Sequence, residues 1–322
     1  MMIATGLLLL AAGTVTPDAI RVRKFEFTYR AEVPVPDGAR RVDVWLPYPT
    51  SDENQTVREL GVSAPYPFTI AKEPEYGNSV LHLAAAKTRE KTFAIEMKFE
   101  VERREYVRRD FTRATSDAID RSNPNLARWL LPDRLVPLDG TIRQMAGEVT
   151  RGKTSVLEKA RAIYDYTVDN LKYDKTGTGW GRGDIYYACD VKRGNCTDFH
   201  AVFIGFARSL GIPAKFEIGF PLPRERGEGE IAGYHCWAEF YLPGYGWVPV
   251  DTSEANKDPS RREYFFGAHD ENRVQFSAGR DVTLAPPQSG APLNFFVYPY
   301  AEADGRAVND VKTRFTYKDL DR

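Results

Sequence analysis

A cysteine near the middle of the chain has the surroundings of a nucleophile. Cys196 follows Gly194 and Asn195 at the expected start of an apolar helix, and Lys192 and Arg193 place positive charge beside it. Unpaired N–H groups and the positive end of the helix dipole at such a position favour the thiolate, which is the reactive form of cysteine. The alternative is a buried structural cysteine, which is common for this residue type.

A nucleophilic thiolate needs a base, and the base needs a group that orients it. His235 lies in an expected strand over residues 234–241, and after a turn at residues 242–245 the return strand ends at Asp251. Counted from the turn, His235 and Asp251 face each other to within about one residue. Opposed side chains of a hairpin lie roughly 4.5–5.5 Å apart, so the Asp251 carboxylate could hold the His235 imidazole.

The remaining cysteines and histidines are weaker candidates. Cys236 is expected on the face of its strand opposite the candidate base, because strand side chains alternate. It would then be a small buried hydrophobe or a disulfide partner of Cys189. His200 lies one helical turn after the candidate nucleophile and could reach the site, but its apolar neighbours favour a packed core histidine.

These segments resemble the transglutaminase-like superfamily. Residues 194–200 and 208–214 resemble its nucleophile segment, and residues 235–239 and 246–251 resemble its histidine and aspartate segments. The resemblance covers about residues 155–251, and the order and spacing of the three segments agree.

The resemblance implies a papain-like core, in which the cysteine-bearing helix packs on an antiparallel sheet. It also implies a triad of Cys196, His235 and Asp251 that forms a thioester with an amide substrate. The superfamily includes cross-linking transglutaminases, peptide N-glycanases, bacterial cysteine peptidases and inactive members. We expect hydrolysis of a peptide or protein amide, because an amine acceptor would need a site that excludes water. Amine transfer to protein glutamine and a non-catalytic binding or scaffolding module are the alternatives.

The stabilisation of the oxyanion is less well defined by the sequence. The backbone N–H of Cys196 is the natural first donor. Trp180 lies where some relatives use an aromatic side chain to bind the oxyanion or shape the acyl tunnel, and an ordinary loop aromatic is an equal alternative. Trp237 is a second weak candidate for the oxyanion site or substrate tunnel, and Tyr173 is weaker still.

The elements that position these residues follow from the hydrophobic pattern. Ser155 and Glu158 form a capping-box pattern at the start of one helix. The helix that begins at Asn195 or the candidate nucleophile has little polar face, so it must be largely buried, and Gly211 and Pro213 end it.

The N-terminal third has a different period. Apolar and polar residues alternate through most of residues 20–110, which is typical of antiparallel strands and predicts a β-sandwich. We expect a linker with short helices over residues 111–140 and a catalytic domain with C-terminal β-strands over residues 141–322, including a hairpin at residues 304–305. The predicted fold class is α+β: an N-terminal antiparallel β-sandwich followed by a papain-like transglutaminase core.

The composition excludes several functions. Of 322 residues 28% are charged and the net charge is -1, so no basic field attracts nucleic acid or anionic lipid. Three cysteines are too few for a disulfide scaffold, and their spacing resembles no zinc site. Glu225, Glu228 and Glu230 lie in a loop with Gly and Arg and are not a calcium cluster of the animal transglutaminase kind. We expect no metal or cofactor, and a peptide or protein as the partner.

The first 16 residues are interpreted as a secretory signal peptide. Residues 3–12 are apolar and small residues follow, but Lys and Arg are missing before the run. About ten apolar residues are too few to span a bilayer and suit a signal segment. The alternative is a buried N-terminal strand. We expect export to the periplasm or the exterior, with no stable membrane insertion after removal of the signal.

Overall fold

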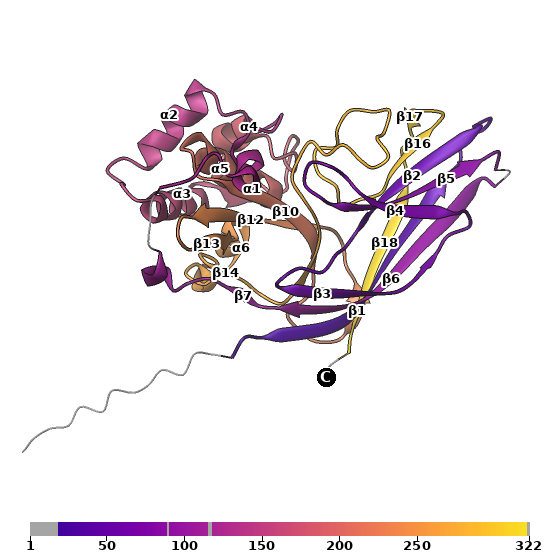
Figure 1. The fold of residues 1–322 in the computed structure, drawn as a ribbon, viewed down its shortest axis with the longest axis horizontal. Coiled ribbons are helices and arrows are strands. Elements are labelled where there is room, and N and C mark those ends of the chain that lie inside the picture. The colour runs from indigo at the N-terminus through magenta and orange to yellow at the C-terminus, as the bar shows by residue number, and fades with distance from the viewer. Residues whose placement is uncertain (1–18, 89, 115–117, 321–322) are drawn as a thin grey trace, which may run out of the picture.

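The structure is a computed structural model that describes residues 19–320 apart from residues 89 and 115–117. It has the predicted α+β class, with the helices gathered on one side of the molecule and the long strands on the other (Figure 1). The signal segment predicted for residues 1–16 lies outside the described residues.

Two five-stranded antiparallel sheets form the strand-rich side. The alternation read from the sequence is seen directly in the first strand, where every second side chain from Arg23 to Val33 is buried. The first sheet consists, in spatial order, of β11 (Glu228–Glu230), β18 (Lys312–Asp319), β1 (Val22–Pro34), β6 (Thr92–Arg104) and β3 (Gln55–Ser63). The second consists of β17 (Arg306–Ala307), β16 (Tyr300–Ala303), β2 (Arg41–Tyr48), β5 (Ser79–Ala86) and β4 (Phe68–Lys72).

The C-terminal strands, which the sequence assigned to the catalytic domain, pair with strands of these two sheets. β18 pairs with β1 over eight residues, and β16 pairs with β2. The apolar face of β18 requires this placement, because Phe315 packs edge-on against Tyr29 with ring centroids 4.8 Å apart. The predicted turn at residues 304–305 is present, since Ala303 pairs with Arg306, but it joins the short strands β16 and β17 and not the two longer strands predicted over residues 293–300 and 311–317.

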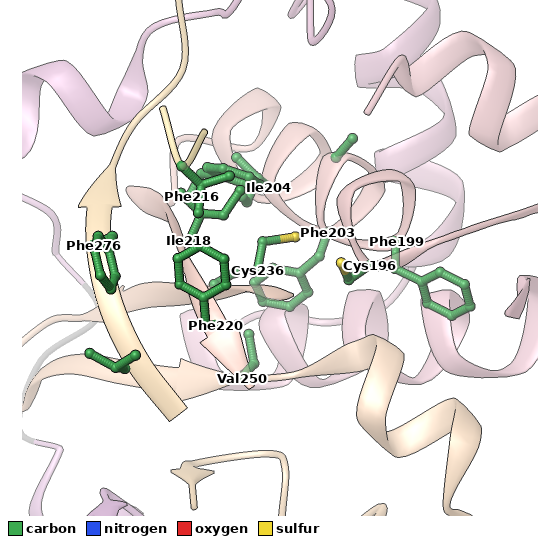
Figure 2. Close-up of a cluster of buried hydrophobic side chains, with 14 of the residues drawn as sticks. Cys196, Phe199, Phe203, Ile204, Phe216, Ile218, Phe220, Cys236, Val250 and Phe276 are labelled. Carbon is green, nitrogen blue, oxygen red and sulfur yellow. The ribbon is translucent and has the colours of Figure 1, made fainter. Parts of the chain in front are cut away.

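A third antiparallel sheet carries the core. In spatial order it consists of β13 (Gly246–Val250), β12 (His235–Leu242), β10 (Ala214–Pro221) and β15 (Arg273–Ala278). Helix α5 (Cys196–Ser209) packs on β12 and β10, and Phe203, Phe216 and Ile218 fill the space between helix and sheet (Figure 2). Every residue of α5 from Cys196 to Arg208 is buried, as its lack of a polar face predicted.

The other helices surround α5. They are α2 (Gly140–Val149), α3 (Val156–Asn170), α4 (Ile185–Val191) and α6 (Thr252–Lys257). The capping box predicted for α3 is present, with Ser155 and Glu158 bonded reciprocally. Backbone N–H groups of Ser155 and Thr154 lower the pKa of Glu158 to about 2.

Short elements connect the two sides. Between residues 111 and 140 the chain forms η1 (Phe111–Arg113), α1 (Pro124–Ala127) and η2 (Arg128–Leu130). β7 (Tyr106–Val107) pairs with β14 (Ala268–His269), and β8 (Lys172–Tyr173) pairs in parallel with β9 (Arg193–Gly194). The last short helix is η3 (Pro259–Arg261). The pairing of β8 with β9 brings Tyr173 beside Gly194, at the entrance to α5.

Candidate active site

Cys196 is the first residue of α5 and is only 2% exposed. Asn195 caps the helix, because its side-chain oxygen accepts the Thr197 N–H at 2.9 Å. The N–H of a residue at this position has no acceptor within the helix, so it is available to a bound group. The thiol and this N–H lie together at the positive end of the helix dipole.

A buried carboxylate fixes the chain that leads into the helix. Asp198 accepts the N–H of Asn195 at 2.9 Å, that of Gly181 at 2.6 Å and that of Gly183 at 3.0 Å. These bonds tie the loop around residue 180 to the start of α5. Gly194 makes room for this arrangement, since a Cβ there would lie 2.2 Å from an Asp198 oxygen.

His235 and Asp251 meet as the sequence predicted. The Nε2 atom of His235 lies 2.8 Å from Oδ2 of Asp251. The strand register alone would not achieve this, because Ala238 pairs with Val250 and the ladder would set Asp251 opposite Trp237. Asp251 reaches the imidazole because it leaves β13 and becomes the cap of α6.

The Asp251 carboxylate has further partners that hold its orientation. Its Oδ1 atom accepts the Ser253 hydroxyl and the Glu254 N–H, each at 3.0 Å. On the other oxygen, Arg273 donates from Nη1 at 3.3 Å. Asp251 and Arg273 are both buried, so this ion pair is shielded from solvent. Nothing in the local sequence around Arg273 marks it, and only the fold brings it here.

Electrostatics in the site favour a charged pair. Burial raises the pKa of the Cys196 thiol, but hydrogen bonds with Cys236 and His235 and the charge of His235 bring it well below its usual value. Burial opposes the protonation of His235, yet Asp251 and Cys196 raise its pKa to about 10. Burial also raises the pKa of Asp251, but His235 and Arg273 hold it well below its usual range. A thiolate, an imidazolium and a carboxylate are the favoured forms at neutral pH.

The imidazole of His235 is oriented by these contacts. Its Nε2 atom is engaged by Asp251, so Nδ1 is the ring nitrogen that remains for the Cys196 sulfur. Its ring also lies 5.9 Å, centroid to centroid, from that of the buried Trp237.

Two residues near the site were missed or misplaced by sequence reasoning. Cys236 is directed toward Cys196 and not away from the site (Figure 2). The side chains of β12 do alternate. Cys196, however, lies beside the first residues of this strand, so both His235 and Cys236 can reach it. All three cysteines are free, so the disulfide considered between Cys189 and Cys236 is not formed. The Cys236 sulfur instead lies 3.8 Å from Thr197 Oγ1, and Cys189 is on α4.

His200 is buried, as predicted, but it also touches the site. Its Nδ1 atom lies 2.7 Å from the Cys196 carbonyl oxygen. Its Nε2 atom is 3.7 Å from Oδ1 of Asp251. Burial lowers the pKa of His200, so the neutral ring is favoured. His200 is therefore a neutral side chain that contacts Cys196 and Asp251 without adding charge to the site.

A groove of about 430 Å³ opens onto His235. Its walls are largely apolar or aromatic and its rim carries two lysines, whose Nζ atoms lie 5.7 Å (Lys175) and 4.8 Å (Lys257) from the centroid of the Tyr173 ring. The other lining residues are Pro221, Leu222, Pro223, Glu230, Ile231, Ala232, Gly233, Tyr234 and Glu254.

The two candidate tryptophans lie outside this groove. The indole N–H of Trp180 donates to the Gly177 carbonyl at 3.1 Å, within its own loop. Trp237 is fully buried, and its N–H donates to Glu217 at 2.7 Å. The third aromatic candidate, Tyr173, does line the groove.

Residues 19–320, apart from the undescribed positions, offer neither a metal site nor a helix suited to span a membrane. No group of three or more His, Cys, Asp or Glu side chains there is arranged to hold a metal ion. No helix in the same part of the chain combines the length and apolar character needed to cross a membrane.

Comparison with known proteins agrees with this geometry. Residues 143–252 match the model of the transglutaminase-like superfamily. This segment is a transglutaminase-like core. It contains Cys196, His235 and Asp251, all within the matched residues. The core and these side chains together support cysteine-based catalysis in general.

The relatives extend beyond the core. An uncharacterized protein of Haemophilus influenzae is 29% identical, over 88% of this chain and 87% of its own length. The uncharacterized protein YebA of Bacillus subtilis is 26% identical over 42% of this chain, which corresponds to 21% of its length. The crystal structure of a "putative cysteine protease" from Cytophaga hutchinsonii is 18% identical, with a TM-score of 0.63 over 94% of this chain and 92% of that one. The whole arrangement of sheets and core is therefore a shared fold.

Proposed function

We propose that this protein hydrolyses an amide bond of a peptide or protein through Cys196, His235 and Asp251. The observation that carries the proposal is the buried contact of 2.8 Å between His235 Nε2 and Asp251 Oδ2, which leaves the other ring nitrogen for Cys196. A base oriented by a carboxylate beside a cysteine at a helix start is the arrangement that nucleophilic catalysis needs.

In the proposed mechanism the Cys196 thiolate attacks the amide carbonyl carbon. The backbone N–H of Cys196 donates to the resulting oxyanion. His235 protonates the leaving amine through Nδ1, the C–N bond breaks, and a thioester remains on Cys196. His235, now neutral, takes a proton from water, and the hydroxide releases the carboxylic acid and regenerates the thiolate. Asp251 stabilises the imidazolium throughout.

The groove beside His235 supports an extended peptide as substrate. Its largely apolar walls suit the side chains of a peptide. We propose in addition that the enzyme acts after export, on the basis of the apolar run at residues 3–12.

The test is peptide cleavage in water enriched in oxygen-18. Purified protein is incubated with a proteome-derived peptide mixture, with and without a primary amine such as cadaverine, and products are read by mass spectrometry. We expect new C-termini that carry one heavy oxygen, and none with the Cys196→Ala variant. If cadaverine amides form instead of carboxylic acids, the proposed hydrolysis is wrong and the reaction is amine transfer. Absence of any product from folded wild-type protein would favour a binding module.

A further inference from the structure

The site contains a second sulfur that the proposed mechanism does not use. Cys236 comes from β12 and Cys196 from α5, and their side chains approach each other across the helix–sheet interface (Figure 2). The proximity of the two side chains shifts their pKa values in opposite directions, with that of Cys196 lowered and that of Cys236 raised. The exposed fractions of Cys236 and Cys196 are 0% and 2%.

The surroundings of Cys236 distinguish it from a space-filling residue. Its sulfur is 3.7 Å from His200 Nδ1 and 3.8 Å from the Thr197 hydroxyl. An alanine or valine would satisfy the packing of a buried strand, whereas a thiol adds a group that can form a bond with the nucleophile. The two sulfurs differ in charge, because burial and the neighbouring Cys196 raise the pKa of Cys236 while that of Cys196 is lowered.

We propose that Cys196 and Cys236 form a reversible disulfide when the protein meets a peroxide, so that Cys236 is the resolving thiol of the active site. The proposal rests on the thiolate form of Cys196 that the proposed function also requires. It does not depend on the identity of the substrate.

The chemistry balances in two steps. The Cys196 thiolate attacks one oxygen of hydrogen peroxide, the O–O bond breaks, and hydroxide leaves while the sulfur becomes a sulfenic acid. Cys236 then loses its proton and attacks the Cys196 sulfur; the S–S bond forms, the S–O bond breaks, and the released hydroxide and the proton make water. A dithiol restores both thiols. Peroxide is the oxidant and is reduced by two electrons.

Formation of this bond would both block and protect the nucleophile. A sulfur held in a disulfide cannot attack an amide, so turnover stops. It is also removed from the irreversible oxidation that follows sulfenic acid. Cys189 offers a matched control, since it is half-buried on α4 and burial raises its pKa to about 11, which keeps it a thiol.

The experiment treats wild-type protein, Cys236→Ser and Cys189→Ala with hydrogen peroxide under non-reducing conditions. Intact mass and peptide mapping are the readouts. Wild type and Cys189→Ala should lose about 2 Da, with Cys196 and Cys236 in one cross-linked peptide pair that dithiothreitol separates. Cys236→Ser should instead gain about 32 or 48 Da on Cys196, which dithiothreitol does not remove.

Two outcomes would overturn the proposal. One is accumulation of sulfinic acid on Cys196 in the wild type at the same rate as in Cys236→Ser. The other is a disulfide that involves Cys189. Because the readout is mass, failure of the proposed hydrolysis would leave this result intact. Conversely, a protein that hydrolyses peptides but forms no such bond would refute the disulfide alone.

Discussion

Two buried polar clusters adjoin the core sheet, and they differ in how their charges are stabilised. The first is the triad. The second, called here the Glu217 cluster, consists of Arg103, Lys215, Glu217 and Glu239, which lie on a cavity of about 320 Å³. Phe216 and Ile218 face α5 in Figure 2, so the alternation of β10 turns Lys215 and Glu217 to the other side. Trp237 links the clusters, because its ring lies near His235 and its N–H reaches Glu217.

The difference between the clusters lies in how their charges are partnered. Asp251 has His235 and Arg273 on one carboxylate oxygen, so all three are favoured as ions. Glu217 is also buried, but the nearby Lys215 is bonded to Glu239 at 3.0 Å. Burial and the charge of Glu239 then raise the pKa of Glu217 to about 8. Burial alone therefore favours a neutral carboxyl group, whereas a directly bonded cation keeps a buried carboxyl group ionised.

The largest expected effect is loss of the nucleophile. Cys196→Ala should abolish turnover, a loss of at least about 1,000-fold, because no other thiolate lies beside His235. Its thermal midpoint should stay within about 2 °C of the wild type, since only one small atom is removed. Initial rates and calorimetry check both values, with Cys189→Ala as the control that keeps activity. Retained activity with a large fall in stability would make Cys196 a structural residue.

Removing the negative charge of Asp251 should make the triad resemble the Glu217 cluster, in which the buried ionisable group lacks a directly bonded counter-ion. In Asp251→Asn, the imidazolium loses its main support, so kcat/KM should fall about 100- to 10,000-fold. In the wild type the pKa of His235, about 10, means that the charged pair is present below this pH and is lost as the pH rises through it.

The pH profile gives the check on that variant. Wild-type activity should decline on the alkaline side as the pH approaches 10, and the decline should move to lower pH in Asp251→Asn. A variant with an unchanged alkaline limb would show that Asp251 does not set the protonation of His235.

The smallest expected effect concerns the Glu217 cluster. The folded protein holds the Glu217 proton up to a pKa of about 8, above the value in the unfolded chain, so this residue makes stability fall as the pH rises from about 5 to about 8. Glu217→Gln, which can still accept the Trp237 N–H, should remove this slope. At pH 8 the variant should be more stable by about 3.5 kcal/mol, and at pH 5 it should nearly equal the wild type.

Urea unfolding at the two pH values measures this difference. Equal stability gains at pH 5 and pH 8 would mean that Glu217 is ionised throughout, and the contrast between the clusters would disappear. The effect of Glu217→Gln on kcat/KM should be smaller than that of Asp251→Asn, because Glu217 reaches His235 only through Trp237.

Sequence reasoning found the parts of the site that depend on local signals. The start of α5 near Asn195, the burial of that helix and the hairpin that carries His235 and Asp251 all follow from residue types and short spacings. Arg273 and the direction of Cys236 depend on how strands distant in sequence are placed, and no local pattern carries that information.

The same limit explains the fold-level difference. Alternation in residues 311–317 predicts a strand, observed as β18, but does not predict which strand it pairs with. β18 joins β1 across nearly the whole length of the chain, a pairing set by packing among Tyr29, Phe220 and Phe315. Contacts of such high sequence separation are visible only in the folded protein.

The central claim is that Cys196 is a thiolate because His235 faces it, and alkylation tests it most directly. Wild type and His235→Ala are treated briefly with limiting iodoacetamide at pH about 6, where an ordinary thiol barely reacts, and labelled peptides are mapped. The account predicts selective labelling of Cys196 in the wild type and its loss in His235→Ala, with Cys189 unlabelled in both. Equally slow labelling of Cys196 in the two folded proteins would contradict it.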